Sequence, residues 1–517
     1  MRRGQFINSI RTVQAVLASI IVVAASAPPA YGLDSSVCGA SGQTAEVTGS
    51  DNAAVDVPAV QTAVNNGGTV LLTGTFDFGE SGHVLLNNAV AICGEADASG
   101  APLTTIRRGE WTFHTPYPGT MPPTAAGPTV TIQHIHFVES RGTAIHLAYS
   151  GGASLRHNVI DQMRFRKVPA VDSQCNTRLN PGSLPPVFVA CERAAIVVGP
   201  EILRGSGFLT NCSSTAPIVC RYTPHLVSGN IDVSDNKIDV SGSESTTLIR
   251  ATGMFVSMYV GADVRVERNS VNGSTRTGLA IHDGIADENG RGSLLIADNR
   301  ITSHVRSGFN FNLGPRAPIG MVTGFNNNPT YGTDPDRQMI PVLITNNTID
   351  LGDPNSDPTL PVRTPPMGII DIWNGALITG NTITVHADIT STVGRLSTSG
   401  GVMATASFQV LTHNTVMGEA CNAVRIGGTV DGQERRANVG IANNLTKFQA
   451  FAGGFNRCAD VWLEPASHDN TMVGNSGSVI DDGVDNTVTG LMPVKGGVGV
   501  AVSEAEHYAN DVDFGFD

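Results

Sequence analysis

The most constraining feature of the chain is a short pattern that recurs through its middle and C-terminal parts. Each copy has an aliphatic residue, two further residues, an asparagine, one residue and a second aliphatic, as in Leu155-Arg-His-Asn158-Val-Ile160. The clear copies centre on Asn158, Asn236, Asn269, Asn299, Asn347, Asn381 and Asn414, and weaker copies follow at Asn444 and Asn475. From Asn236 onward the spacings are 33, 30, 48, 34, 33, 30 and 31 residues. A repeat of this length indicates a stack of similar coils.

Each copy predicts a short strand that turns at its asparagine. The aliphatic residues alternate with polar ones as in a strand with one buried face, and asparagine tolerates the left-handed backbone of a tight bend. The copies lack the i, i+3, i+4, i+7 spacing of an amphipathic helix and the leucine-rich consensus of a horseshoe repeat. Glycine is abundant (58 residues) and only 15% of residues are charged, which suits a repetitive β protein. We therefore expect stacked parallel strands with an asparagine ladder.

A second strand follows about twelve residues after most of these asparagines. Its copies are Thr143–Leu147, Gly278–His282, Gly308–Leu313, Gly368–Trp373 and Ala423–Gly427. Upstream, Asp56–Val64 is followed by Gly67-Gly-Thr-Val70 and Gly74-Thr-Phe76. From about residue 55 to 490 the chain resembles the pectin-lyase-like superfamily of right-handed parallel β-helices. The resemblance implies an all-β single solenoid with an N-terminal capping helix at about residues 55–66. Lyases, hydrolases, epimerases and adhesins share this body, so the resemblance implies no single activity.

The first 32 residues have the layout of a secretory signal peptide. Arg2, Arg3 and Arg11 precede or flank an apolar run from Val13 to Ala25, and small residues follow at Ala30 and Gly32. We expect a secreted or periplasmic protein with the β-helix over 33–490 and an acidic tail over 491–517. The net charge of -13 argues against a nucleic-acid partner. The eight cysteines suit an oxidising compartment, and proximity favours the pairs Cys38–Cys93, Cys175–Cys191, Cys212–Cys220 and Cys421–Cys458.

Signatures of the best-known enzymes of this fold are missing. The chain has no Gly-His-Gly or Arg-x-Lys of the polygalacturonase-like hydrolases and no Asp-Pro-His-Asp of the mannuronan-epimerase-like proteins. Candidate site residues must therefore come from the stacking of the second strands. Counted from each ladder asparagine, one outward column holds Ala280, Asn310 and Arg425, and the next holds His282 and Asn312. Aligned by pattern, Asp371 with Trp373 and Trp462 with Glu464 enter the same columns, and His146 falls in the first.

These columns predict a polar cluster in the middle of the solenoid, between the long insertions 314–341 and 350–367. His282 could act as the base of a uronate elimination. Asp283 and Asp371, expected roughly 10 Å apart, could form the carboxyl pair of a hydrolase. The expected substrate-binding residues are Asn310, Asn312, Trp373, Arg425 and Trp462. For each of them an ordinary solvated face or loop packing is the alternative.

The sequence assigns no metal ligands. His134 and His136 alternate on one strand without further ligands at a suitable spacing. Calcium is the only cofactor suggested, by Asp350, Asp353, Asn355 and Asp357 in one loop and Asp283, Asp287 and Asn289 in another; solvated turns are the alternative. The function that we expect is binding of an extracellular polysaccharide, with cleavage by a lyase or hydrolase mechanism as one hypothesis. A non-catalytic cell-surface or periplasmic scaffold or adhesin is the other.

Overall fold

The computed structural model divides the chain into two units, Met1–Gly42 and Gln43–Asp517, and every residue described here lies in the second. The described residues are 43–116, 126–163, 193–199, 227–241, 251–257, 260–274, 277–282, 284, 286–287, 289–304, 319–324, 340–352, 366–371, 375–386, 400–404, 406–420, 422–430, 433–435, 438–442, 445–450, 459–465, 467–475 and 477–489. The predicted signal peptide and acidic tail lie outside them and remain predictions. The predicted disulfide pairs also remain predictions, because Cys93 is the only cysteine in these ranges.

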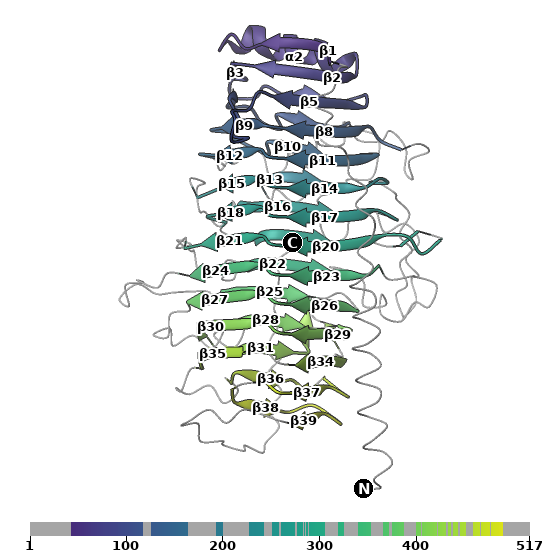
Figure 1. Ribbon diagram of the computed structural model, residues 1–517, viewed down its shortest axis with the longest axis vertical. Helices are drawn as coiled ribbons and strands as arrows, with labels where there is room; N and C mark the ends of the chain where they lie inside the picture. The colour runs from purple at the N-terminus through teal and green to yellow at the C-terminus, as the bar shows by residue number, and fades with distance from the viewer. Residues whose placement is uncertain are drawn as a thin grey trace. The chain divides into compact units, whose positions relative to one another are not determined.

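Three parallel sheets run along the second unit, and successive strands stack from α2 at one end to β38 and β39 at the other (Figure 1). Sheet A contains, in stacking order, β1 Gln43–Thr48, β2 Gly68–Thr73, β5 Val90–Gly94, β8 Thr129–Gln133, β11 Gly152–Arg156, β14 Ile231–Ser234, β17 Asp263–Glu267, β20 Ser293–Ala297, β23 Val342–Thr345, β26 Ala376–Thr379, β29 Ser407–Thr412, β34 Asn438–Ala442, β37 Thr471–Val473 and β39 Thr487–Thr489. Sheet B contains β3 Thr75–Asp77, β6 Thr104–Arg107, β9 Ile135–Val138, β12 Val159–Asp161, β15 Lys237–Asp239, β18 Ser270–Asn272, β21 Arg300–Ser303, β24 Thr348–Gly352, β27 Thr382–His386, β30 Thr415–Ala420 and β35 Leu445–Ala450. Sheet C contains β4 Val84–Leu85, β7 Phe113–His114, β10 Ile145–Leu147, β13 Arg193–Val198, β16 Ala251–Ser257, β19 Thr277–His282, β22 Ile319–Gly324, β25 Met367–Asp371, β28 Gly400–Ala404, β31 Asn422–Ile426, β36 Val461–Leu463 and β38 Val479–Asp481. A short antiparallel hairpin of β32 Gly428–Val430 and β33 Gln433–Arg435 is added outside these sheets.

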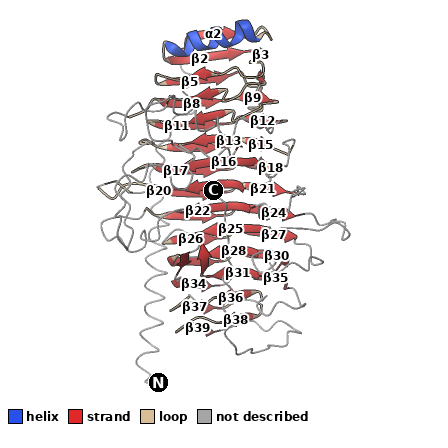
Figure 2. Cartoon of the chain, turned by 180° about the vertical axis from the view of Figure 1, so that it is seen from behind, coloured by secondary structure: helices blue, strands red, loops and turns tan. Residues whose placement is uncertain are grey.

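Each coil visits sheets A, B and C in turn, as β17, β18 and β19 do, and then returns to sheet A. One side of every strand faces the interior. The inward column of sheet A is aliphatic from Val70 through Ile132 and Ile296 to Leu411, and all four side chains are fully buried. The chain is thus a right-handed parallel β-helix, as the repeat predicts. Figure 2 shows the same stack of strands with its single described helix at one end.

The asparagine ladder forms where sheet A turns into sheet B. The Oδ1 of Asn299 accepts hydrogen bonds from the backbone N and the Nδ2 of Asn269, both at 3.0 Å. The Nδ2 of Asn299 donates to the Oδ1 of Asn347 at 2.9 Å, and the pattern continues through Asn381 to Asn414. The residue before each ladder asparagine from Asn158 to Asn414 has positive φ; in most coils it is not glycine, as at Asp298 (56°). The predicted ladder is confirmed. The expectation that the asparagine itself takes the left-handed backbone of the bend is wrong, because the preceding residue takes it and leaves the asparagine side chain free to point along the stack.

The N-terminal end is capped by helix α2, Ala53–Asn65, which covers most of the predicted capping segment. Asp56 holds the cap in place although its side chain is buried. One carboxylate oxygen accepts from the backbone N and the hydroxyl of Ser50, and the other accepts from the backbone N of Asn52 and of Asp77. The helix therefore joins the first coil through a fully used carboxylate, and covers apolar residues that a bare first coil would expose.

Small residues occupy one inward position at the start of the sheet C strands. The column contains Ala144, Ala195, Gly253, Gly278, Gly320, Gly368, Gly401 and Ala423. A Cβ atom on Gly320 would lie 2.6 Å from the carbonyl oxygen of Gly368 and 2.5 Å from the Cγ2 of Ile349. Such distances leave no room for a side chain without a shift of backbone, so the narrow corner between sheets B and C explains these glycines.

Candidate functional site

The outward column of sheet C tests the predicted site directly. In the structure it contains His114, His146, Val197, Phe255, Ala280, Val322, Ile370, Met403, Arg425 and Trp462. The prediction that His146, Ala280, Arg425 and Trp462 share one column is confirmed. The residues predicted for this column between Ala280 and Arg425, Asn310 and Asp371, are wrong.

Asn310 and Asn312 are not the neighbours of β19. The strand stacked between β19 and β25 is β22, Ile319–Gly324, so His282 pairs with Gly324 and not with Asn312. Both asparagines lie outside the described residues. The insertion after β21 offers two segments with a glycine followed by alternating apolar residues, Gly308–Leu313 and Gly320–Thr323. Counting from the ladder selects the first, whereas the stacked strand is the second.

Asp371 is displaced by one residue from its predicted column. Ile370 occupies the outward position, and Asp371 pairs with Thr323 and Ala404 in the inward column. A shift of one residue turns a side chain to the other face of the sheet. Asp371 is fully buried, where its carboxylate accepts hydrogen bonds from the hydroxyl of Thr323 and the Nε2 of Gln409. It is a core residue, so the predicted carboxyl pair with Asp283 does not form on the outer face.

The other predicted catalytic and binding residues have mixed outcomes. His282 ends β19, as expected, and pairs with Ser257 on the preceding strand. The side chain of His282 and the whole of Asp283 and Trp373 lie outside the described residues. The role of His282 as a base remains a prediction.

Imidazole and indole rings gather at the N-terminal end of the outward column. His83 precedes β4, Trp111 precedes β7, and His114 and His146 occupy neighbouring positions on β7 and β10. The Trp111 and His146 rings stack with centroids 5.0 Å apart and planes 13° apart. The His83 and His114 rings meet edge to face at 5.1 Å. We call these four residues the aromatic–imidazole site.

Two ring nitrogens of this site, the Nε2 of His114 and the Nδ1 of His146, are buried and have no hydrogen-bond partner among the described residues. Burial lowers the pKa of His114 to about 4 and that of His146 to about 3, and the neighbouring histidine in each case adds to the effect. Both rings are therefore neutral at ordinary pH, and a neutral imidazole carries one donor and one acceptor nitrogen. Trp111 and His114 remain partly exposed. The site thus combines an apolar ring face with uncharged hydrogen-bonding atoms.

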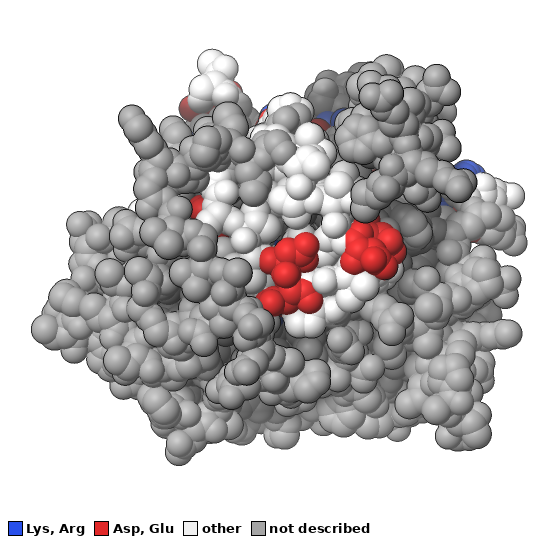
Figure 3. Space-filling model, turned by 90° about the horizontal axis from the view of Figure 1, so that it is seen from below, with Lys and Arg blue, Asp and Glu red and all other residues white. Residues whose placement is uncertain are grey.

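The other end of the same column carries a charged cluster. The Nε of Arg425 donates to the carboxylate of Glu464, and the guanidinium lies 4.9 Å from the centre of the Trp462 ring. The Nε1 of Trp462 donates to the Oδ2 of Asp482 at 2.9 Å. Arg425 and Trp462 are 3% and 5% exposed, so both are packed in this cluster and neither presents an open platform. Seen from the end of the stack where β38 and β39 lie, acidic side chains stand out among uncharged ones (Figure 3).

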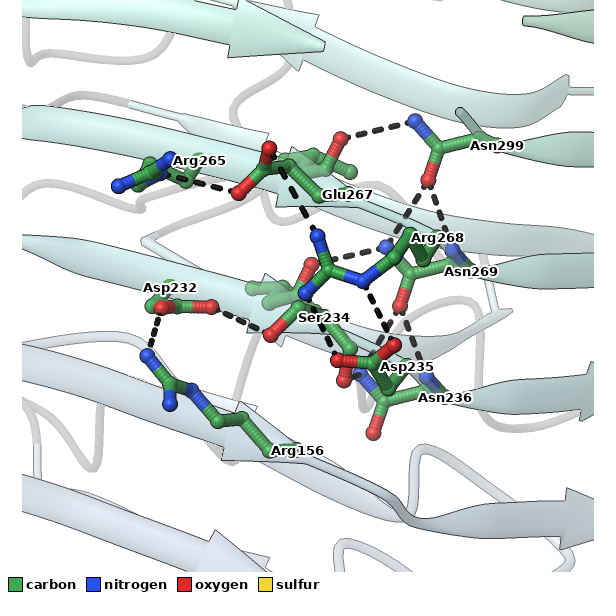
Figure 4. A network of polar contacts seen from close by, with 12 residues as sticks. Arg156, Asp232, Ser234, Asp235, Asn236, Arg265, Glu267, Arg268, Asn269 and Asn299 are labelled. Carbon is green, nitrogen blue, oxygen red and sulfur yellow. Dashed lines mark hydrogen bonds and ion pairs between the residues drawn. The ribbon is translucent and has the colours of Figure 1, made fainter. Parts of the chain in front are cut away.

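The outer face of sheet A carries a network of charges (Figure 4). Arg156 pairs with Asp232, and Arg268 donates two hydrogen bonds, of 2.8 and 2.9 Å, to the carboxylate of Asp235. Arg265 and Glu267 join on the same strand at 3.0 Å. The Arg156–Asp232 and Arg268–Asp235 pairs link successive coils beside the asparagine ladder. Because each arginine is matched by a carboxylate, we interpret the network as stabilising the stack.

The described carboxylates proposed as calcium ligands have other partners. The Oδ1 of Asp287 accepts hydrogen bonds from the backbone N of Asn289 and of Arg291, which closes a turn. Asp350 lies on β24 between His304 and His386, 3.4 and 3.7 Å away. Asp283, Asp353, Asn355 and Asp357 lie outside the described residues. Within the described part of the chain no group of three His, Cys, Asp or Glu side chains is arranged to hold a metal ion.

No family model and no curated protein matches the chain. Several solved structures are similar to it. PfbA, a surface adhesin of Streptococcus pneumoniae, has a TM-score of 0.41 at 13% identity over 78% of this chain and 90% of its own. The A-module of mannuronan C-5 epimerase AlgE6 from Azotobacter vinelandii has 0.35 at 11% identity, with 85% and 96% covered. Tailspike protein 3 of bacteriophage CBA120 also has 0.35 at 11%, with 90% and 65% covered.

The described helix α2 is too short and too polar to cross a membrane, and no other described helix exists that could. At identities of 11–13% the similarity to solved structures transfers no residue role and no activity. The sheets, their register and the ladder carry the assignment: the chain is a right-handed parallel β-helix.

Proposed function

We propose that this protein is exported and binds an extracellular polysaccharide at the aromatic–imidazole site. The observation that carries the proposal is the stacked pair of Trp111 and His146 beside two buried imidazole nitrogens without partners. The apolar face of a sugar ring packs well on an aromatic side chain, and its hydroxyl groups need fixed donors and acceptors. Buried polar atoms normally have partners, so an orphaned pair in a partly exposed cluster favours a site that a polar ligand completes.

Binding is proposed here ahead of cleavage. The predicted hydrolytic pair required Asp371 on the outer face, and this residue belongs to the core. Two further carboxylates beside the outward column, Glu464 and Asp482, are bonded to Arg425 and Trp462. Elimination in a uronate polymer, with His282 as the catalytic base, remains a hypothesis. It predicts new ultraviolet absorbance when the protein meets a uronate polymer, and the absorbance should disappear in His282→Ala.

The experiment that tests the proposal is a glycan-binding screen of the exported chain, residues 33–517, with Trp111→Ala and Trp111→Phe as a matched pair. We expect the alanine variant to lose affinity by about tenfold or more, since a buried aromatic contact is worth roughly 1–3 kcal/mol. The phenylalanine variant keeps an aromatic face and should keep most of the affinity. Circular dichroism of both variants confirms that the β-helix is intact.

Two outcomes contradict the proposal. If the folded protein binds no glycan in a broad screen, the alternative of a protein-binding scaffold gains support. That alternative already has one observation in its favour, because the outer side of sheet C around Val197, Phe255 and Ala280 is an apolar cluster and not an open groove. If a glycan binds and both Trp111 variants bind it equally well, the ligand is held elsewhere on the molecule.

A further inference from the structure

We propose that the aromatic–imidazole site selects neutral polysaccharides and rejects polyuronates and sulfated polymers. The inference rests on the proposed function and names the substrate class of that same site. It depends on which charges surround the four rings, and on the hydrogen-bonding state of the rings themselves.

Among the described residues of the coils that build the site, 43–116 and 126–163, every arginine is paired with a carboxylate. Between residues 43 and 163 the sequence has four arginines and no lysine. Arg107 pairs with Asp51, Arg108 with Asp77, Arg141 with Glu80 and Arg156 with Asp232. Recognition of a carboxylate or sulfate on a sugar usually relies on arginine or lysine. Here each arginine already meets a protein carboxylate, so a bound uronate would have to displace one.

Backbone hydrogen bonds stack Gly79, Gly109 and Arg141 two residues before Trp111, and on this ground we take the Arg141–Glu80 pair as the rim of the site. Glu80 lies three residues before His83, and Arg141 lies five residues before His146. Glu80 is 57% exposed and Arg141 only 23%, so the side that meets solvent is mainly the carboxylate. An approaching polyanion therefore meets a negative charge first. The net charge of -13 over the whole chain adds a repulsion of the same sign.

The rings offer hydrogen bonds without charge. Because burial keeps His114 and His146 neutral, their nitrogens can donate to and accept from hydroxyl groups, but they supply no positive charge. A carboxylate that enters this desolvated cluster would lose hydration and gain no counter-ion, which is costly. A neutral hydroxyl would lose little hydration and would meet the uncharged, partly exposed rings of Trp111 and His114. The arrangement therefore discriminates by charge.

The test uses polymers that differ only in the oxidation state of C6: a β-1,4-glucan and its glucuronan, a mannan and its mannuronan, and a galactan and its galacturonan. Affinity of the chain 33–517 for soluble oligomers of each is measured by calorimetry. We expect at least one neutral member to bind at least about tenfold more tightly than its uronate partner. Because no ion pair forms, its affinity should hold between about 0.05 and 0.5 M salt.

The Glu80→Gln variant separates charge from packing. Removal of this rim carboxylate should raise the affinity for the uronate member severalfold and leave the affinity for the neutral member unchanged. A uronate that binds the original chain as tightly as its neutral partner, through Trp111, overturns the inference and leaves the proposed function standing. Failure of both members of all three pairs to bind overturns the inference, and counts against the proposed function as well. A uronate affinity unaltered by Glu80→Gln refutes the role of the rim charge.

Discussion

Removal of one rung of the asparagine ladder should weaken the whole stack, and Asn299 is the best place to test this. Its side chain is 1% exposed and makes four hydrogen bonds. The Oδ1 accepts from the backbone N and the Nδ2 of Asn269, and the Nδ2 donates to the carbonyl of Val266 at 2.8 Å and to the Oδ1 of Asn347. Alanine at this position leaves two buried N–H donors of Asn269 without an acceptor.

The magnitude follows from those two donors. A buried donor that loses its partner costs about 1–3 kcal/mol, so Asn299→Ala should lower the free energy of unfolding by roughly 2–6 kcal/mol. The acceptors at Val266 and Asn347 add less, since the Oδ1 of Asn347 keeps its bond from the backbone N of residue 299. Against a typical total of about 5–15 kcal/mol this is a large loss. In a solenoid it should appear first as separate unfolding of the coils around the gap.

The assay is urea denaturation followed by far-ultraviolet circular dichroism, with Asn272→Ala as the matched control. Asn272 lies on β18 of the preceding coil, where it pairs with Thr302 of β21. It is exposed and makes one side-chain hydrogen bond of 3.2 Å to Asp239. Its removal should cost under about 1 kcal/mol. If Asn299→Ala and Asn272→Ala shift the first transition by the same amount, the ladder does not stabilise the stack in the way argued here.

Three further predictions concern the core and the site. Acid should destabilise the protein between pH 6.5 and about 4, because His114 and His146 are protonated in the unfolded state over this range but not in the folded state. Two such groups give a slope of about 2.7 kcal/mol of unfolding free energy per pH unit. His146→Leu should halve this slope in unfolding curves taken at several pH values. Gly320→Ala should lower the free energy of unfolding by about 1–3 kcal/mol, since the added methyl group meets backbone atoms; an unchanged free energy of unfolding would show that the corner can widen. Asp371→Ala should lower the free energy of unfolding by about 2–4 kcal/mol in the same assay, because Gln409 loses its buried acceptor. A loss of glycan affinity without a loss of stability would instead indicate a functional role for this carboxylate.

The fold follows from the sequence because the ladder asparagines repeat at almost constant spacing. Stacking places each of them against the next, so the pattern alone predicts sheets A and B and the turn between them. The cap is equally local, since Asp56 and its partners Ser50 and Asn52 lie within seven residues of one another. Both features depend on short-range order in the chain, which a pattern records well.

The register of sheet C depends on three-dimensional packing that the pattern does not record. The 48-residue step from Asn299 to Asn347 contains two segments able to form the strand, and the aliphatic pattern does not distinguish them. The stack selects β22, which sets Gly320 in the glycine column between Gly278 and Gly368. A search for that column of small residues would have found the right strand. Gly368 and Asp371 both face inward although they are three residues apart, so simple alternation counted from the glycine column would not have placed Asp371 correctly.

The aromatic–imidazole site escaped prediction because it lies before the first ladder asparagine. Positions counted from an asparagine cannot be extended to β7, where no copy of the pattern exists. Two signals were nevertheless present. Phe113-His114 and Ile145-His146 repeat an apolar residue followed by histidine, and Trp111 is the third tryptophan of the chain, beside the two singled out. Neither signal reports the stacking of Trp111 on His146, because those residues are 35 positions apart.

Burial of sheet C on both sides determines where a site can lie. Parallel sheets are commonly covered on both faces, and the outward residues Val197, Phe255, Ile370 and Met403 are apolar and at most 5% exposed. A polysaccharide cannot lie along the middle of this column while these side chains stay buried. Among the described residues of the column, polar side chains occur only toward its two ends. The Arg425 end is closed by its own ion pair, and for this reason we propose the other end, with its partly exposed indole, as the place where a ligand binds.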